Sequence, residues 1–366
     1  MLETLVVGAG PVGLVAAIEL ARRGRSVRII EQRNQSIAES RALGINPRTL
    51  DIMEASGATE RILAEGIRIR RARLVSRGKS LGTIEFSAIN HRFPFMTALP
   101  QARTEALLAE VLAGLGIQVE RGTRFVGNEG SAEAPALRLV GTGGDEVVLA
   151  QRVFGCDGAR SSVREDAGIG FEGSTDDHRW TLMDVAADWP YPADEARFML
   201  SAAGSLFVLP VTEGVWRFVA TSETPEELVP PDVRLGEVLW RSQFRIAHKL
   251  AATMQKGATF LAGDAAHIHS PAGARGMNGG IEDAATFAWL TETGQLHRYS
   301  AMRLPAARRV LAQVERQTRQ AEQAHMGALA FRETVARFVL PWPFVQRFAS
   351  GFILAQDTAS PPWLRK

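Results

Sequence analysis

The stretch Gly8-Ala9-Gly10-Pro11-Val12-Gly13 decides the fold of this chain. It follows an apolar run at residues 4–7 that predicts a short buried strand, and it leads into helical spacing of apolar residues from Pro11 to Arg23. A second strand is predicted at Ser26 to Glu31. Strand, glycine turn, helix and strand in this order predict a βαβ unit and a Rossmann-like α/β fold with a parallel sheet.

Each glycine of this stretch has a separate physical use. Gly8 permits a tight turn, Gly10 leaves room for a pyrophosphate, and Gly13 lets the helix pack closely on the strand. Pro11 and Val12 begin the helix, whose unpaired N–H groups and dipole favour negative charge. The stretch therefore predicts a dinucleotide site but leaves NAD, NADP and FAD open.

Acidic residues follow two of the predicted strands. Glu31, with Gln32 beside it, ends the second strand and is placed to accept hydrogen bonds from an adenosine ribose. Far downstream, a buried strand at 258–262 ends in Gly263-Asp264, at the sheet edge where ligands of such folds lie. A glycine-rich loop at 271–280 then becomes a helix, predicted at 280–290. A second carboxylate before a second helix start indicates a cofactor that is held at two ends.

Together these stretches resemble the class A FAD-dependent aromatic hydroxylases, the family of para-hydroxybenzoate hydroxylase. The resemblance implies that Asp264 binds the ribityl and pyrophosphate region of FAD and that the loop from Pro271 to Asn278 lines the isoalloxazine ring. The cofactor-binding residues that it implies in this part of the chain are Gly263, Asp264, Pro271, Gly273, Gly276, Met277 and Asn278. The loop reads Gly273-Ala274-Arg275-Gly276 where many relatives have Gly-Gly-Gln-Gly.

Three further matches extend the resemblance. The stretch 155–164 resembles the family's second fingerprint, which implies that Asp157 and Arg164 take part in FAD and NAD(P)H binding. Arg41 is placed like an arginine that reaches the flavin, and Gln101 like a glutamine that hydrogen-bonds FAD. Taken singly, Asp157 with Gly158 is a plain turn, Arg41 a surface arginine and Gln101 a polar residue at a helix start.

The resemblance also implies a reaction. NAD(P)H would reduce FAD, O2 would add at flavin C4a, and the hydroperoxide would hydroxylate a phenolic or polycyclic aromatic in secondary metabolism or aromatic degradation. Pro271 is expected against the reacting face of the ring, and the helix after Gly276 near flavin N1 and C2=O, where Arg275 would add positive charge. We assign no catalytic base, because the candidates are expected to be surface or structural residues: His91, His178, Tyr191 and Arg217.

The chain is expected to contain a discontinuous FAD-binding domain, an inserted β domain and a helical end. The FAD-binding domain is predicted at 1–70, 100–172 and 256–300, the substrate domain at 71–99 and 173–255, and C-terminal helices at 301–366. Strands are predicted at 67–75, 83–86, 182–187, 197–200, 206–211 and 215–221, and further helices at 48–55, 101–115 and 303–325. Apolar residues of the substrate domain suit an aromatic guest or a packed core: Phe198, Met199, Leu206, Phe207 and Leu209.

Composition excludes several other functions. A net charge of +2 without a basic block argues against nucleic acid, and the single cysteine, Cys156, with no Cys/His cluster argues against metal. No segment has the roughly 20 apolar residues of a membrane span. Because Met1 leads straight into a strand, no export signal is expected and cytoplasm is the default location. The apolar tail at 338–354 is expected to pack on its own domain rather than on a partner or a membrane surface, and the oligomeric state stays open.

Two alternatives remain on the same scaffold. One is an FAD-dependent reductase of an isoprenoid or another alkene, and the other is a protein that holds FAD and guides a reactive intermediate without oxidising it. A flavin halogenase is disfavoured because the expected Trp-x-Trp-x-Ile-Pro signature is absent.

Overall fold

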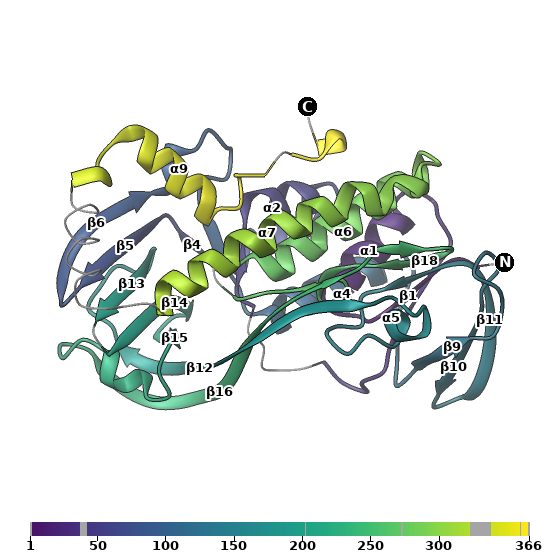
Figure 1. Ribbon diagram of the computed structural model, residues 1–366, viewed down its shortest axis with the longest axis horizontal. Helices are drawn as coiled ribbons and strands as arrows, with labels where there is room; N and C mark the ends of the chain where they lie inside the picture. The colour runs from purple at the N-terminus through teal and green to yellow at the C-terminus, as the bar shows by residue number, and fades with distance from the viewer. Residues whose placement is uncertain are drawn as a thin grey trace.

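The computed structural model describes residues 2–36, 42–201, 203–271, 274–322, 338–358 and 360–364. Two predicted cofactor-binding residues, Arg41 and Gly273, lie outside this part of the chain. Figure 1 shows one sheet on the right, a second sheet on the left, and a long helix, α7, that runs between them.

The first sheet is built on the predicted βαβ unit. Strand β1 pairs in parallel with β2 on one side and with β11 on the other, and β11 pairs in parallel with β18. An antiparallel hairpin, β9 and β10, extends from β11. The path through the sheet is β17 (Gln255–Lys256), β18 (Thr259–Leu261), β11 (Gly144–Gly155), β1 (Leu2–Val7), β2 (Val27–Glu31) and β8 (Val119–Arg121), with β9 (Arg124–Asn128) and β10 (Ala136–Gly141) off it.

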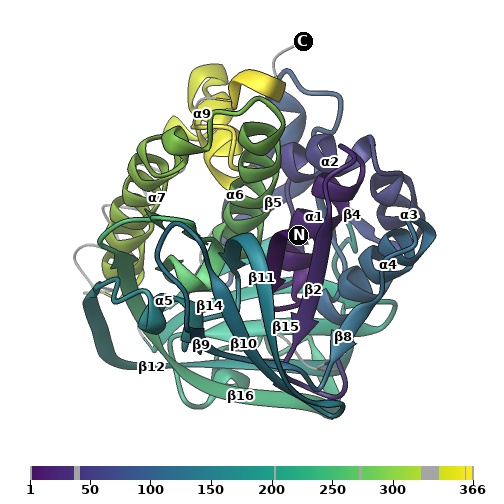
Figure 2. The ribbon, with the colours of Figure 1, turned by 90° about the vertical axis from the view of Figure 1, so that its right-hand side faces the viewer.

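Helix α1 (Pro11–Ala21) lies at the centre of the helices that cover this sheet. It contacts both α4 (Gln101–Gly114) and α6 (Arg275–Glu292), and Figure 2 shows α2 to α4 on one side of it and α6 and α7 on the other. Almost every residue of α1 is buried, which is why its sequence is apolar on all faces. The remaining helices are α2 (Pro47–Glu54), α3 (Ala58–Glu65), α5 (Ser162–Asp166), α7 (Tyr299–Glu322) and α9 (Pro343–Ile353).

The second sheet has two long, curved strands that reach back toward the first. Strands β12 and β16 each have 18 residues and pair along most of their length. The path is β19 (His267–Ile268), β16 (Arg234–Ala251), β12 (Phe171–Asp188), β15 (Val215–Ala220), β14 (Gly204–Thr212), β13 (Glu195–Ser201), β5 (Arg71–Ser76) and β6 (Lys79–Glu85). A small third sheet contains β3 (Gly44–Ile45), β7 (Met96–Ala98) and β4 (Ile67–Ile69).

The α/β fold class is confirmed, but several element boundaries were wrong. The strand predicted at 67–75 is two strands that break at Arg70 and join different sheets. Strand β12 begins at Phe171, before the predicted 182, and β16 was not predicted because its outer half carries charged residues on both faces. Helix α6 begins at Arg275, not at Gly280, although glycine ordinarily weakens a helix. The predicted domain boundaries are not tested by these pairings and stay predictions.

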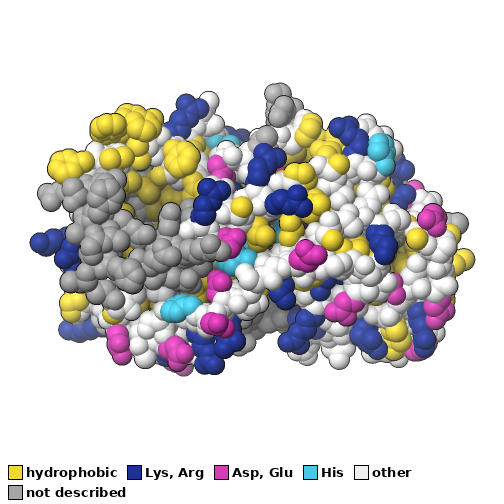
Figure 3. Space-filling model, viewed as in Figure 1, with side chains coloured by type: hydrophobic (Ala, Val, Ile, Leu, Met, Phe, Trp, Pro, Cys, Tyr) yellow, Lys and Arg dark blue, Asp and Glu magenta, His cyan; other side chains and the backbone are white. Residues whose placement is uncertain are grey.

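The C-terminal part of the chain covers the edge of the second sheet. The Gln346 side chain accepts a hydrogen bond from the Glu85 N–H at 2.8 Å and donates one to the Thr83 carbonyl at 2.7 Å, so it pairs with the edge strand β6. Aromatic side chains gather on the outer surface of α9, at the upper left of Figure 3. Among the described helices, none combines the length and the apolar character that crossing a membrane requires.

Candidate cofactor and active site

The loops after β1, β11 and β18 lie together because these three strands are parallel neighbours in the first sheet. Gly8 has φ +103°, and a β-carbon there would lie 2.5 Å from the Cys156 carbonyl oxygen. Val12 packs against two glycines from the other end of the chain: β-carbons at Gly263 and Gly280 would lie 3.2 and 2.5 Å from its Cγ2. Glycine at these positions therefore allows the three motif loops to meet.

The other two glycines of the turn differ in their surroundings. A β-carbon at Gly13 would lie 1.9 Å from the Gly8 carbonyl oxygen, so Gly13 is required by packing alone. A β-carbon at Gly10 would meet no atom nearer than Glu105 Oε1, at 4.0 Å. Gly10 therefore borders open space at the start of α1, where Pro11 is the first residue and no side chain caps the helix. This agrees with the predicted room for a phosphate.

The Glu31 carboxylate lies beside the glycine turn. Its Oε2 accepts a hydrogen bond from the Ala9 N–H at 3.0 Å, and its Oε1 accepts one from the Arg33 N–H at 3.0 Å. These bonds fix the carboxylate at the end of β2, where it was predicted to meet a ribose. Gln32 is exposed next to it.

A second carboxylate near this turn, Glu105, was missed by the sequence analysis. Gln101 begins α4, as predicted for the glutamine, and its Nε2 donates to Glu105 Oε1 at 2.7 Å. Burial raises the pKa of Glu105, and the nearby charge of Glu31 adds to that rise. The spacing of four residues, which places both side chains on one face of a helix, was the available signal.

Asp283 holds the loop after β18, and it too was missed. Its Oδ2 accepts hydrogen bonds from the Gly263 N–H at 3.1 Å and from His267 Nε2 at 2.7 Å, and its Oδ1 accepts one from Arg303 Nε at 2.6 Å. Burial alone would raise the pKa of Asp283, but the charges of Arg303 and His267 outweigh it and lower that pKa. An aspartate among buried apolar residues of a helix was the signal, because such a charge requires partners.

Asp264 itself is exposed at the end of this loop, next to Gly263, which has φ +56°. The neighbouring His269 has its pKa lowered to about 4 by burial, so its ring is neutral at pH 7. The loop thus presents a carboxylate on the same sheet edge as Glu31, with an uncharged imidazole close by.

The loop before α6 and the first turn of this helix contain five of the predicted cofactor-binding residues, of which Asn278 has hydrogen-bond partners in the fold. Pro271 is exposed, as are parts of Gly276 and Met277. The Asn278 side chain accepts a hydrogen bond from the Asn46 N–H at 3.0 Å and donates one to the Gly44 carbonyl at 2.9 Å. Asn278 therefore joins the first turn of α6 to β3, and its predicted contact with the cofactor stays a prediction.

Arg275 lies toward the C-terminal segment. Its Nη2 donates to the Phe352 carbonyl at 2.6 Å and forms an ion pair with Asp357 Oδ1 at 2.7 Å, and only 4% of the residue is exposed. The guanidinium charge is therefore partly balanced by Asp357, and the positive charge that Arg275 is expected to add near the flavin stays a prediction. A small cavity of about 50 Å³ beside Arg275 has room for water but not for an organic substrate.

Asp157 and Arg164 of the second fingerprint, the stretch 155–164, form hydrogen bonds with neighbouring parts of the fold. The Asp157 carboxylate accepts hydrogen bonds from Ser162 Oγ at 3.0 Å and from the Val163 N–H at 3.2 Å at the start of α5. Arg164 is 6% exposed and donates to the carbonyls of Ala159 and Ala265, each at 3.0 Å. These contacts connect α5 with the Gly263 loop, and the predicted NAD(P)H contacts of both residues stay predictions.

Cys156, in the second fingerprint, packs against the glycine turn that follows β1. Its thiol donates to the Val7 carbonyl at 3.2 Å and lies against Gly13. Burial raises the pKa of this thiol well above its ordinary value, and the charge of Asp157 adds to the rise.

The candidates considered for a base all have structural partners. His91 binds Asp51, Tyr191 binds Asp232, Arg217 binds Asp184, and His178 Nε2 lies 2.6 Å from the Thr221 carbonyl oxygen.

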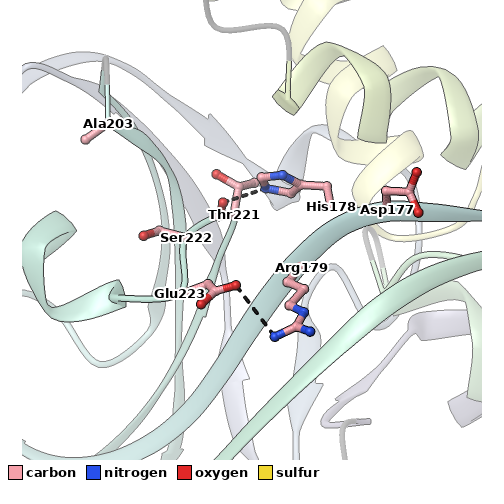
Figure 4. Close-up of a pocket in the computed structure, with 7 residues that line it drawn as sticks. All are labelled: Asp177, His178, Arg179, Ala203, Thr221, Ser222 and Glu223. Carbon is pink, nitrogen blue, oxygen red and sulfur yellow. Dashed lines mark hydrogen bonds and ion pairs between the residues drawn. The ribbon is translucent and has the colours of Figure 1, made fainter.

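His178 also lines a cavity of about 410 Å³ in the second sheet (Figure 4), together with Asp177, Arg179, Ala203, Thr221, Ser222 and Glu223. This cavity is polar and contains no residue of the three motif loops. Among the described residues, no cluster of His, Cys, Asp and Glu is arranged to hold a metal ion.

Comparisons with known proteins agree with this geometry. The family profile described as FAD binding domain matches residues 1–314. The chain is 31% identical to 6-methylpretetramide 4-monooxygenase of Streptomyces rimosus over 93% of its length, and 31% identical to pentachlorophenol 4-monooxygenase of Sphingobium chlorophenolicum over 84%. It spans 64% and 62% of the lengths of these two proteins. The crystal structure of p-nitrophenol 4-monooxygenase from Pseudomonas putida has a TM-score of 0.86 and 22% identity over 96% of each chain, and shows the same fold.

Ala274, the residue before α6, has a strained backbone that predicts opposite tolerance to two substitutions. Its φ of +50° is unfavourable for any residue with a β-carbon and worst for a β-branched one. We expect Ala274→Val to destabilise the protein by about 2 kcal/mol or more. Ala274→Gly should stay within about 1 kcal/mol of the parent, since glycine adopts this conformation freely. Thermal unfolding of the parent and both variants measures this, and equal melting temperatures for the two variants would contradict it.

Proposed function

The chain belongs to the FAD binding domain family, and from that premise we propose that it is a flavoprotein monooxygenase that uses NAD(P)H and O2 to hydroxylate an aromatic substrate. The observation that carries the proposal is that the loop after β18 and helix α6 pack against Val12 at the uncapped start of α1, while the loop after β11 packs against Gly8. The names of two relatives support the reaction class, since both are monooxygenases of aromatic compounds.

The residues at this sheet edge fit FAD. The open space at Gly10, where a β-carbon would have no near neighbour, suits a pyrophosphate at the start of α1. Glu31 at the end of β2 would hold the adenosine ribose, and Asp264 at the end of β18 the ribityl chain. Backbone N–H groups of Gly276 and Met277, at the uncapped start of α6, would face the ring. When bound, FAD supplies the electron transfer from NAD(P)H and the activation of O2.

One face of the second sheet carries aromatic side chains that we assign to the substrate site. Phe207 stacks on Phe198 with ring centroids 4.2 Å apart and lies 6.4 Å from Trp180. Leu209, two residues further along β14, packs in the same cluster as Ala274 of the loop before α6. Because side chains two residues apart share a face of a strand, Phe207 and Leu209 lie on one face. This face therefore adjoins the proposed flavin loop.

The opposite face of β14 belongs to the core. Leu206 is fully buried in a cluster with Met199, Trp216 and Phe218. The five apolar residues that were left ambiguous therefore separate into two groups: Phe198, Phe207 and Leu209 are candidates for substrate contact, whereas Met199 and Leu206 are core residues.

An ion pair lies on the same face as Phe207. Arg217 donates to both carboxylate oxygens of Asp184, at 2.7 Å each, and its guanidinium is 5.4 Å from the Trp240 ring. We assign Arg217 the role of orienting an oxygen substituent of the substrate, because a guanidinium held in an apolar surface attracts a phenolic oxygen strongly. Asp184 fixes its position.

The reaction itself gives the direct test. Purified protein with FAD should oxidise NADH or NADPH faster when a phenolic or polycyclic substrate is added under air, and the product should contain oxygen-18 from labelled O2. Anaerobic reduction of an alkene would identify the reductase alternative instead. Product formation without NAD(P)H use would identify the protein as one that guides an intermediate. If neither phenolic nor polycyclic aromatics stimulate NAD(P)H oxidation, the hydroxylase proposal is wrong.

Two glycines of one turn should respond differently to alanine. Gly10→Ala fills open space, so the apoprotein should keep its melting temperature while FAD affinity falls by about tenfold or more. Gly13→Ala places a methyl group 1.9 Å from the Gly8 carbonyl, so it should lower the melting temperature of the apoprotein itself. Fluorescence titration with FAD and thermal unfolding without it separate the two effects. Unchanged FAD affinity in Gly10→Ala would remove the pyrophosphate assignment.

Two neighbouring residues of β14 test the substrate face. We expect Phe207→Ala to raise the KM for the aromatic substrate by about tenfold, because it removes apolar contact with the guest. Leu206→Ala should leave KM unchanged and lower the melting temperature, because it opens a cavity in the core on the other face. Steady-state kinetics and thermal unfolding of both variants provide the comparison. An equal rise of KM in both would show that this face does not bind the substrate.

A further inference from the structure

Four large aromatic side chains are exposed together at and before α9. We call Phe338, Trp342, Phe344 and Phe348 the aromatic patch; the exposed fractions of these residues are 69%, 54%, 65% and 72% (Figure 3). Apolar residues scattered singly over a surface are ordinary, but exposed aromatic residues that lie close in the chain, two of them in ring contact, indicate an interaction site. The proposed monooxygenase reaction gives the aromatic patch no role.

Two residues of the aromatic patch, Phe344 and Phe348, lie on α9, which is hydrogen-bonded to β6. On the opposite side of α9, Gln346 binds both backbone groups of β6, and Ser350 Oγ donates to the Glu85 carbonyl at 2.9 Å. Leu340, just before α9, is buried against Gly82. Trp342 and Phe344 contact each other edge to face, with ring centroids 5.5 Å apart. The aromatic rings are therefore presented on a rigid support, which lowers the entropic cost of binding.

The charge of this segment argues against a lipid surface. Between Phe338 and Leu354 the sequence contains one charged residue, Arg347. Helices that lie on membranes combine their apolar face with several lysines or arginines that attract anionic lipids. A surface with aromatic rings and almost no charge instead resembles the buried centre of a protein interface, where charged residues are depleted and Phe and Trp are enriched.

The exposed area matches what two copies of this chain need. Aromatic side chains bury about 150–250 Å² each, so these exposed fractions amount to about 500 Å² on one copy. Two copies joined through the aromatic patch would bury about 1,000 Å², which is the lower bound for a specific interface. In a two-fold contact the same surface meets itself, and an apolar patch with almost no charge can do so without repulsion between like charges. We propose that the aromatic patch is a two-fold interface between two copies of this chain.

Sedimentation of the FAD-loaded protein over a range of about 1–100 μM tests the interface. The parent should form a dimer, and the double variant Phe344→Glu and Phe348→Glu should weaken the dimer by about a hundredfold or more, since it places like charges opposite each other. The matched control is Leu149→Glu, which changes a 63% exposed leucine on β11 outside the aromatic patch. The control should remain a dimer.

Cross-linking provides a second measurement that needs no disruptive change. Cys156 is the only cysteine of the sequence, and its thiol is packed under the glycine turn with a raised pKa. Phe348→Cys therefore introduces one reactive thiol into the aromatic patch, and a short bis-maleimide should join two copies through it, whereas Leu149→Cys should not cross-link. A parent that stays monomeric at every concentration, a dimer that survives the double glutamate change, or binding of monomers to phosphatidylglycerol vesicles would each overturn the proposal.

Discussion

The structure depends on the close approach of Val12 to Gly263 and Gly280, two residues that follow it by more than half the chain. A β-carbon at Gly280 would lie 2.5 Å from Val12 Cγ2, so α1 and α6 can pack this closely only because Gly280 has no side chain. Because Val12 lies in the first turn of α1, the approach packs the uncapped start of α1 against the loop after β18 and against α6. The positive end of α1 and the carboxylates of Glu31 and Asp264 suit the long, anionic, two-ended ligand that we propose at this edge.

The buried Asp283 carboxylate stabilises the loop after β18. Burying an aspartate costs free energy unless its oxygens are hydrogen-bonded, and the Asp283 oxygens accept hydrogen bonds from Gly263, His267 and Arg303. Asp264, the residue after Gly263, is exposed on the loop that these bonds hold. In our proposal the two acids have separate tasks: the exposed Asp264 would contact the cofactor, and the buried Asp283 holds the loop that carries it.

The sequence was most informative where local chemistry and chain order agree. The βαβ unit, the α/β class and the start of α4 at Gln101 follow from periodicity and from glycine spacing, because these depend on neighbours in the sequence. Asp283 was missed because its partners, Gly263 and Arg303, each lie 20 residues away, and Glu105 was missed although its partner Gln101 is on the same face of α4. Arg275 was expected to act on the flavin, yet its described contacts are with residues 352 and 357, which no local pattern joins to the loop. Likewise, only the alternation of β14 could separate Phe207 from Leu206.

The position of Cys156 has a consequence for the oxygen chemistry that we propose. Proteins that pass electrons to O2 release some hydrogen peroxide, which oxidises thiolates far faster than protonated thiols. Cys156 remains protonated, because its pKa is raised, and its sulfur is covered by the turn that it supports. Burial therefore favours the less reactive, protonated form of the single cysteine of this sequence, and the same packing shapes the glycine turn.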